Sequence, residues 1–203
     1  MSNNKKYLSR KSASGVVRII GGQWRSRKIS VEVAPGLRPT GDRVRETLFN
    51  WLGTKLEGAH CLDIYAGSGV LSLEALSRGA GACTAIDNNL AVIKCLRSNA
   101  EALDAELNII STDAISYLRQ RPPAQKFDVV FIDPPFTASL CNETCELLED
   151  KKWLANEALI YCEMPAATID FSAPANWLLK KDKVAGDVRY MLYSRIESAG
   201  KLQ

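Results

Sequence analysis

The chain has 203 residues, of which 46% are hydrophobic and 24% charged, and its formal net charge is +3. This length suits one domain with a small appendage, and the composition is that of a globular protein with a real core. No apolar stretch approaches the length that spans a bilayer, and the first 15 residues lack the apolar centre of a secretory signal, so we expect neither a membrane protein nor a secreted one.

The excess of positive charge lies in the first 45 residues, which carry eleven Lys and Arg against two acids; the remainder carries fifteen basic and twenty-one acidic residues. Residues 1–15 are rich in Ser and Lys and predict a disordered basic arm. If the charges stopped at Lys11, a solvated tail would explain them. The basic residues continue beyond Lys11, through sequence whose pattern predicts folded structure. This favours a nucleic acid as the binding partner.

Residues 16–57 predict a hairpin and a helix. An apolar run and a basic, alternating run flank Gly21-Gly22, which is the pattern of a β-hairpin over residues 15–33 with a turn at the two glycines. Thr40 is placed to cap a helix that runs to about Leu56. We expect this segment to extend from the main domain and to contact nucleic acid.

Residues 58–198 alternate between strand and helix and predict one α/β domain. The alternation favours a parallel sheet covered by helices on both faces. Residues 177–183 and 188–196 then form an antiparallel hairpin at the end of the chain. The predicted strands end near Tyr65, Asp87, Ser111 and Asp133 with another over 158–163, and the predicted helices lie near 69–78, 89–102, 114–120 and 139–151.

Acids stand at the ends of four successive strands, and in a doubly wound sheet such positions line one crevice. The loop Asp63–Gly69 leads into a helix that begins at Val70. Its glycines let a ligand approach the backbone, and the free amides at a helix start favour a carboxylate. Asp87 follows the next strand, where a carboxylate can accept hydrogen bonds from ribose hydroxyls. The four acids are Asp63, Asp87, Asp113 and Asp133.

The glycine loop does not complete the dinucleotide fingerprint, because Ser72 stands where the third glycine would be. An acid at the start of the loop also suits an ammonium group better than a pyrophosphate. The pattern therefore favours an amino acid joined to a nucleoside as the ligand, rather than NAD.

The segment Asp133-Pro134-Pro135-Phe136 follows a buried strand. The prolines fix the backbone and leave the Pro134 carbonyl projecting, so this oxygen and the Asp133 carboxylate offer two acceptors to an –NH₂ group. Phe136 offers a face on which a planar base can stack. Two acceptors can hold an exocyclic base amine with its lone pair aimed at an electrophilic methyl, so the reaction needs positioning and electrostatics but no strong base. A turn whose acid only caps a loop is the alternative.

The six cysteines lie in apolar contexts, and His60 is the only histidine. Metal binding would favour a CxxC pair or nearby histidines, so we expect buried thiols that behave as small hydrophobes, no metal and no disulfide. A reducing, cytoplasmic location follows.

Taken together, the glycine loop, the four strand-end acids and the D-P-P-F segment resemble the motifs of class I S-adenosylmethionine-dependent methyltransferases. More narrowly, the chain resembles the RsmD family of bacterial 16S ribosomal RNA guanine-N2 methyltransferases, through residues 18–22, residues 37–46, the glycine loop and residues 133–136. The resemblance implies a Rossmann-like, doubly wound fold with a seven-stranded, mostly parallel sheet, a C-terminal antiparallel hairpin and a small N-terminal extension.

The resemblance also implies a cofactor, S-adenosyl-L-methionine, and a role for each matching residue. Asp63, Gly67 and Gly69 would hold its methionine part, Asp87 its ribose and Asp113 its adenine amine. Ser68, Asn88 and Ala114 are further candidates for cofactor binding. Asp133 and Pro134 would orient the target amine, with Phe136 against the base. The implied partner is 16S ribosomal RNA within a small-subunit assembly particle, and we expect a monomer. The candidates for RNA contact are Arg18, Arg25, Arg27, Lys28, Arg38, Arg43 and Arg45, although Arg43 or Arg45 could instead brace the cofactor pocket.

Three other functions remain open from the sequence. An adenine-N6 methyltransferase could use the same D-P-P-F chemistry, but the chain lacks a sizeable insertion for target recognition, which suits a base that arrives splayed or flipped from its stack. An NAD-dependent oxidoreductase conflicts with the incomplete fingerprint and the basic N-terminus. A non-catalytic RNA-binding factor on a degenerate methyltransferase fold conflicts with the presence of all four acids.

Overall fold

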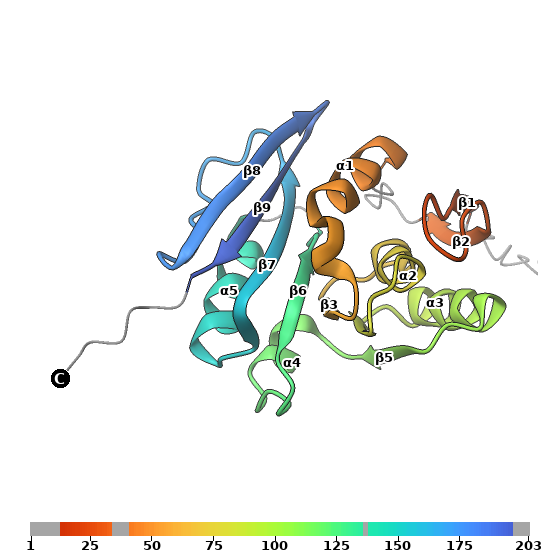
Figure 1. Cartoon of the computed structure of the whole chain (residues 1–203), viewed down its shortest axis with the longest axis horizontal. Helices are drawn as coiled ribbons and strands as arrows, with labels where there is room; N and C mark the ends of the chain where they lie inside the picture. Colours follow the sequence, from red (N-terminus) through yellow and green to blue (C-terminus); the bar gives the residue numbers. More distant parts are fainter. Residues whose placement is uncertain (1–12, 34–40, 136–137, 197–203) are drawn as a thin grey trace, which may run out of the picture.

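The computed structural model describes residues 13–33, 41–135 and 138–196. The described residues form a two-stranded sheet and a seven-stranded sheet, with helices packed on the larger one (Figure 1). The strands are β1 Ala13–Arg18, β2 Lys28–Val33, β3 His60–Asp63, β4 Ala82–Asp87, β5 Leu107–Ser111, β6 Phe127–Ile132, β7 Leu154–Pro165, β8 Trp177–Ala185 and β9 Val188–Arg195. The helices are α1 Asp42–Leu52, the short 3-10 helix η1 Gly53–Leu56, α2 Val70–Ser77, α3 Leu90–Leu103, α4 Ala114–Leu118 and α5 Ala138–Asp150.

The seven-stranded sheet has the order β5-β4-β3-β6-β7-β9-β8, and strands β3 to β7 are parallel. β9 runs antiparallel to β7 and to β8, which closes the sheet with the expected reversed hairpin. The Rossmann-like α/β fold is thus confirmed. The strand order reverses between β3 and β6, and a ligand crevice in such sheets lies at that point, outside the carboxyl ends of the strands.

Two apolar cores cover the two faces of the sheet. On one face, α1 and α2 bury Leu48 and Leu71 against Phe131 of β6. On the other face, α5 buries Leu148 against Val130 of the same strand. Because neighbouring residues of a strand point to opposite faces, both sides of β6 are filled, and its apolar run is buried throughout.

The N-terminal hairpin forms, but its connection is longer than the two-glycine turn predicted from the sequence. Residues 19–27 join β1 to β2, and the backbone amides of Ile19 and Ser26 donate to the carbonyls of Arg27 and Ile19 across the base of this loop. Gly22 has φ of +74°, and a Cβ there would collide with the Ser77 carbonyl. The glycines therefore let the loop pack on the end of α2. β1 also begins at Ala13, so residues 13–15 belong to a strand and not to the predicted basic arm; residues 1–12 of that arm lie outside the described residues.

The first helix is shorter than predicted. α1 begins at Asp42, with Gly41 at the N-cap position and no side-chain cap; Thr40, the predicted cap, lies outside the described residues. The helix ends at Leu52, and Gly53, with φ of +51°, starts one turn of 3-10 helix that reaches Leu56. The boundary lies at the glycine because only glycine adopts this backbone conformation at low cost.

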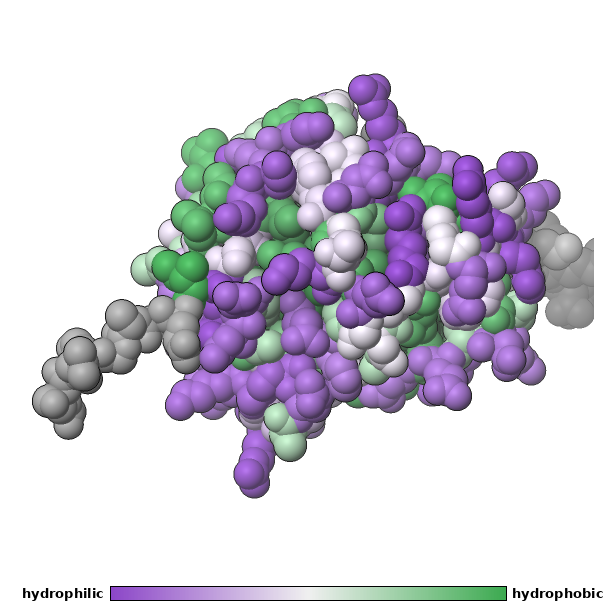
Figure 2. Space-filling view, in the orientation of Figure 1, coloured by the Kyte–Doolittle hydropathy of each residue, from purple (hydrophilic) through white to green (hydrophobic). Residues whose placement is uncertain are grey.

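The surface of the molecule is largely hydrophilic in the view of Figure 2, with apolar residues gathered where β8 begins. Leu178 and Leu179 of this edge strand are about half exposed, and Lys180, Lys181 and Lys183, which follow them, are also exposed. Lysines along an edge strand discourage pairing with another chain. Among the described residues, no helix is both long and apolar enough to cross a membrane.

Candidate active site

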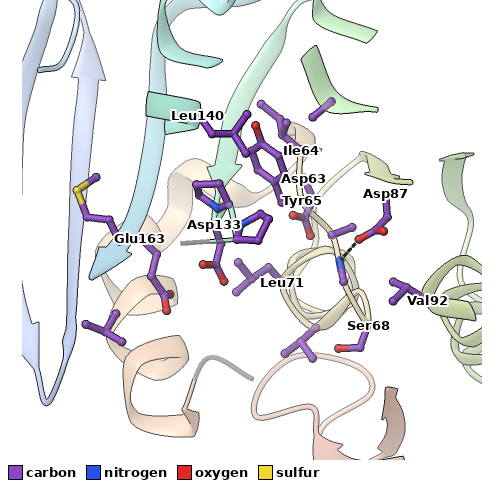
Figure 3. A pocket seen from close by; sticks show the side chains of 18 of the residues that line it. Asp63, Ile64, Tyr65, Ser68, Leu71, Asp87, Val92, Asp133, Leu140 and Glu163 are labelled. Carbon is purple, nitrogen blue, oxygen red and sulfur yellow. Dashed lines mark hydrogen bonds between the residues drawn. The ribbon is translucent and has the colours of Figure 1, made fainter. Parts of the chain in front are cut away.

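A cleft of about 1030 Å³ opens at the carboxyl edge of the sheet, where the strand order reverses. Its lining comes from the ends of β3, β4, β6 and β7, from the first turns of α1 and α3, and from the turn between β8 and β9. Figure 3 shows the acidic side chains of Asp63, Asp87, Asp133 and Glu163 in this region. The acids that line the cleft are Asp63, Asp87, Asp113, Asp133, Glu163 and Asp187.

The glycine loop forms one wall of the cleft. Gly67 and Gly69 both have positive φ, and a Cβ on Gly69 would collide with Leu96 of α3. Asp87 fixes the loop from the neighbouring strand, because its Oδ2 accepts a hydrogen bond from the Gly67 amide at 3.0 Å (Figure 3). Its Oδ1 accepts from the Asn89 amide at 2.8 Å. Asp87 therefore sets the backbone conformation of the loop, and its side chain also lines the cleft.

Asp63 lies at the floor of the cleft and is 1% exposed. Its Oδ2 accepts a hydrogen bond from the Ser72 hydroxyl at 2.5 Å. Burial disfavours the charged carboxylate and raises the pKa of Asp63 to about 7, although the Ser72 hydrogen bonds oppose the shift. A cationic ligand group beside this side chain would shift the equilibrium toward the carboxylate. Ser72, which broke the dinucleotide fingerprint, thus has a role of its own as the partner of this acid.

The other predicted cofactor residues also line the cleft. Asn88 is exposed beside Asp87, and Ser68 lies in the glycine loop with its carbonyl bound by Asn99 at 3.2 Å. Asp113 caps α4, because its Oδ1 accepts a hydrogen bond from the Ser116 amide at 2.8 Å. Ala114 begins that helix and is buried.

Asp133 and Pro134 follow β6 directly and line the cleft, as the predicted geometry requires. In Figure 3 the Asp133 carboxylate points into the space between the glycine loop and β7. Pro134 is buried and Asp133 is half-buried. Phe136, the predicted stacking residue, lies outside the described residues.

Glu163 is a site residue that the sequence analysis did not identify. It follows Cys162 on β7, which pairs with Ile132 on β6, so Glu163 lies beside Asp133 at the same edge of the sheet. Its side chain enters the cleft and is 8% exposed (Figure 3). An acid after an apolar strand was the signal that singled out the other four, and it is present here in Tyr161-Cys162-Glu163.

The basic residues predicted to contact RNA are not gathered at the cleft. Arg43 is exposed on the first turn of α1, where Gly41 and Val44 line the cleft. Arg27 instead donates to the Ala102 carbonyl at 2.7 Å near the end of α3, ~15 Å along the helix from its cleft-lining residue Val92. Arg18, Arg25 and Lys28 are exposed at the same far end of the hairpin, and Arg38 lies outside the described residues.

Arg45 was wrongly placed among the RNA contacts, because its side chain is fully buried. It pairs with Asp42 at 2.6 Å and with the buried Glu74 of α2 at 3.6 Å, and it donates to the Arg18 carbonyl at 3.0 Å. Glu74 also pairs with Arg78 at 2.7 Å. The sequence could not reveal this role, because the partner Glu74 is 29 residues further along the chain, in another helix.

None of the six cysteines, all of which lie among the described residues, is in a disulfide, and five of them are buried. The sulfur atoms of Cys141, Cys145 and Cys162 lie within 4.8 Å of one another between α5 and β7. Hydrogen bonds from the other two thiols lower the pKa of Cys141, while burial raises the pKa of Cys162. Three sulfurs are suitable ligands for a soft metal ion, but all three side chains have no exposed surface and pack inside the apolar core.

Comparison with known proteins shows which family the chain belongs to. The family described as Conserved hypothetical protein 95 matches residues 17–194. Ribosomal RNA small subunit methyltransferase D of Escherichia coli is 51% identical over 185 residues, which cover 91% of this chain and 92% of that protein. The protein of the same name from Haemophilus influenzae is 42% identical, over 93% of this chain and 98% of its own length.

The chain belongs to the RsmD family. The solved structure of the Escherichia coli protein yhhF has the same fold, with a TM-score of 0.84 and 48% identity over 91% of this chain and all of that one. The RsmD-family chain is therefore a methyltransferase. The cofactor that its sequence motifs imply is S-adenosyl-L-methionine. The described cleft fits this cofactor, because it combines a glycine loop that admits a ligand to the backbone with a buried acid suited to an ammonium group and an acid suited to ribose hydroxyls.

Proposed function

We propose that the chain transfers the methyl group of S-adenosyl-L-methionine to the exocyclic N2 amine of a guanine in 16S ribosomal RNA of the small subunit. The observation that carries the proposal is the position of Asp133 and Pro134, which lie at the tip of β6 in the same cleft as the glycine loop. The names of the relatives support ribosomal RNA of the small subunit as the substrate class.

The proposed chemistry depends on orientation rather than on proton abstraction. The lone pair of an exocyclic amine is delocalised into the base, so the amine is a weak nucleophile. Hydrogen bonds from its two N–H groups to the Asp133 carboxylate and the Pro134 carbonyl hold it pyramidal, with the lone pair directed at the methyl donor. The amine becomes more acidic as it gains the methyl group, and the Asp133 carboxylate is placed to accept the proton that leaves. His60 lies at the start of β3, at the opposite end of that strand from the cleft, and takes no part.

The cofactor supplies an electrophilic methyl group when it is bound, and the chain supplies the binding groups. Asp63 and the glycine loop would hold the methionine part, Asp87 and Asn88 the ribose, and Asp113 and Ala114 the adenine. Asp87 serves twice in this arrangement, because it also fixes the Gly67 amide. The order of these residues along the cleft, from β5 through β4 and β3 to β6, would place the methyl group next to Asp133.

A base can reach this cleft only outside a duplex, which suits an unpaired or flipped nucleotide of a ribosomal loop. Arg43, which is exposed beside the cleft-lining Val44, would meet the flanking phosphates. The basic end of the hairpin would contact a more distant part of the RNA, which a ribosomal particle is large enough to supply.

The test is to incubate the protein with labelled S-adenosyl-L-methionine and small-subunit particles from cells that lack this modification, then to digest the RNA and identify the labelled nucleoside. We expect N2-methylguanosine at one position of 16S RNA. Naked 16S RNA, tested in parallel, distinguishes an assembled substrate from free RNA. Label in N6-methyladenosine, or in protein alone, would contradict the proposed function.

A further inference from the structure

Two carboxylates, not one, lie at the substrate end of the cleft. β6 and β7 are parallel neighbours whose register pairs Ile132 with Cys162, so Asp133 and Glu163 are the next residues of adjacent strands. Both line the cleft, and Figure 3 shows both carboxylates directed into the same space. The proposed chemistry uses Asp133 and the Pro134 carbonyl, and it leaves Glu163 without a role.

Glu163 is held in a defined orientation. The Tyr161 hydroxyl donates to its Oε2 at 2.7 Å from within the core. Burial and the neighbouring Glu163 charge both raise the pKa of Tyr161, so this hydroxyl stays protonated and remains a donor. Only 8% of Glu163 is exposed. A carboxylate has about four acceptor sites, so a Tyr161-bound Glu163 can still accept hydrogen bonds from a ligand.

The bases with an exocyclic amine differ in what lies beside that amine. In guanine the N2 amine is next to N1–H, a donor. In adenine the amine is next to N1 and in cytosine next to N3, and both of these ring nitrogens are acceptors. A carboxylate beside the amine-binding groups would therefore accept a hydrogen bond from guanine, whereas it would face a lone pair of adenine or cytosine and lose its hydrogen bond inside a nearly buried site.

We propose that Glu163 determines the specificity for guanine by accepting a hydrogen bond from N1–H while Asp133 and Pro134 hold the N2 amine. The inference rests on the proposed function and deepens it. In this arrangement, Asp133 serves the reaction of any amine that reaches it, and Glu163 decides which base places its amine there. The position of Glu163 beside Asp133 also disfavours adenine as the target base, which the D-P-P-F segment alone does not exclude.

The test pairs a change in the protein with a change in the base. Small-subunit particles are reconstituted with RNA that carries guanosine, 2-aminopurine riboside or 6-thioguanosine at the target position. 2-Aminopurine keeps the 2-amine but has an acceptor at N1, whereas 6-thioguanine keeps N1–H and changes only the 6-substituent. The proteins are the wild type, Glu163→Gln, Glu163→Asp and the control Glu157→Gln, which alters an exposed glutamate of the same strand.

We expect the wild type to prefer guanine over 2-aminopurine by on the order of 10²-fold in kcat/KM, because a site built for a donor rejects a base that lacks it. Glu163→Gln should narrow this ratio to within about tenfold, since the amide can donate to the N1 acceptor of 2-aminopurine. Glu163→Asp should lower kcat/KM for guanine but keep the preference. The wild type should accept 6-thioguanine, and Glu157→Gln should match the wild type throughout.

The outcomes separate this inference from the proposed function. If the wild type methylates guanine N2 but Glu163→Gln lowers kcat/KM equally for guanine and 2-aminopurine, Glu163 is only structural and the inference is wrong. If the wild type does not methylate guanine N2 in native particles, the proposed function fails and the inference fails with it. Calorimetric titration with S-adenosylhomocysteine and a thermal melt report whether each variant is folded. If Glu163→Gln is not folded, the wild type carries the test, because equal kcat/KM for guanosine and 2-aminopurine riboside would contradict the inference.

Discussion

At the scale of single residues, the cleft contains acids in contrasting environments. Asp63 is almost fully buried and accepts a hydrogen bond from Ser72. Asp87 is half-buried and accepts two backbone amides. Carboxylates with such different surroundings serve different ligand groups. Asp63 suits a cation that compensates for its burial, and Asp87 suits neutral hydroxyls.

The raised pKa of Asp63 predicts that cofactor affinity depends on pH. In the free protein the pKa is about 7, so the side chain is protonated below that pH. The ammonium group of the cofactor favours the carboxylate, and binding at low pH must therefore release a proton. We expect the affinity for S-adenosylhomocysteine, measured by calorimetry, to rise about tenfold from pH 6 to pH 8 and then to level off.

Asp63→Asn is the matched control, because the amine of the ligand titrates in both proteins and only the Asp63 contribution is lost. The variant should bind more weakly at pH 8 with a flatter pH profile. Identical pH profiles for the two proteins would contradict the assignment of Asp63. The same raised pKa should make the free wild-type protein less stable relative to Asp63→Asn as the pH rises from about 4 through 7, because the folded state must then ionise a buried group.

The sequence predicted part of the site, and the reason for each omission is physical. The strand-end acids and the glycine loop were found because they follow local patterns. Arg45 was misplaced because its partner Glu74 comes from another helix, and no local pattern reports such a pair. Glu163 was missed although it follows an apolar strand, because its importance depends on the strand order that places β7 beside β6. The roles of Arg45 and Glu163 both depend on contacts between segments that are far apart in the sequence, which composition and local pattern do not report.

At the scale of elements, one buried charge cluster joins the N-terminal extension to the catalytic fold. Arg45 of α1 and Glu74 of α2 are both fully buried. Glu74 accepts the Ile20 amide at 2.8 Å, and Arg45 donates to the Arg18 carbonyl at 3.0 Å. Buried charges are tolerated only when their partners are present, so the cluster fixes how the hairpin and α1 sit on α2.

Removal of one partner should therefore be costly. Arg45→Ala leaves Glu74 without one of its two cationic partners and should lower the free energy of unfolding by about 3 kcal/mol or more, as measured by urea denaturation. Arg43→Ala, two residues away on the same helix but exposed, should change it by less than about 0.5 kcal/mol. Equal effects of the two substitutions would mean that the buried cluster does not stabilise the fold.

The elements of the catalytic fold were predictable because strands and helices there have distinct hydrophobic periods. The predicted helix over 89–102 agrees with α3, and the closing hairpin agrees with β8 and β9. The N-terminal extension was predicted less well. The turn was assigned to Gly21-Gly22 from local chemistry, whereas those glycines serve contact with α2 at Ser77 and Arg78. Tertiary packing, and not the local preference of glycine for turns, therefore explains the two glycines at these positions.

At the scale of the whole molecule, the described basic residues expected to contact RNA occupy two places. Arg43 is exposed on the first turn of α1, next to the cleft-lining Val44, and the far end of the hairpin carries Arg25 and Lys28. We infer that the RNA contacts the protein along the hairpin side of the molecule as well as at the cleft. Contacts with phosphate make affinity fall with salt, because bound counterions are released.

The double substitution Arg25→Ala, Lys28→Ala should weaken RNA binding and reduce the slope of log affinity against log salt by roughly 1.5, since each phosphate contact contributes about 0.7 to 0.9. The control is Lys151→Ala, Lys152→Ala, which removes the same charge from exposed residues after α5, at the opposite edge of the sheet from the cleft. Filter binding over a range of salt measures both. If the two double substitutions weakened RNA binding equally, affinity would depend only on the net charge of the protein, and the inferred contact at the hairpin would be contradicted.

The central claim is that Asp133 orients the amine and does not hold the cofactor. The direct test measures single-turnover methyl transfer and S-adenosylhomocysteine affinity for Asp133→Ala, beside Asp150→Asn, an exposed acid at the end of α5, as the control. We predict that Asp133→Ala lowers the rate of transfer by at least about 10³-fold and leaves the affinity within about threefold of the wild type. Loss of cofactor affinity together with transfer, or transfer at the wild-type rate, would contradict the account.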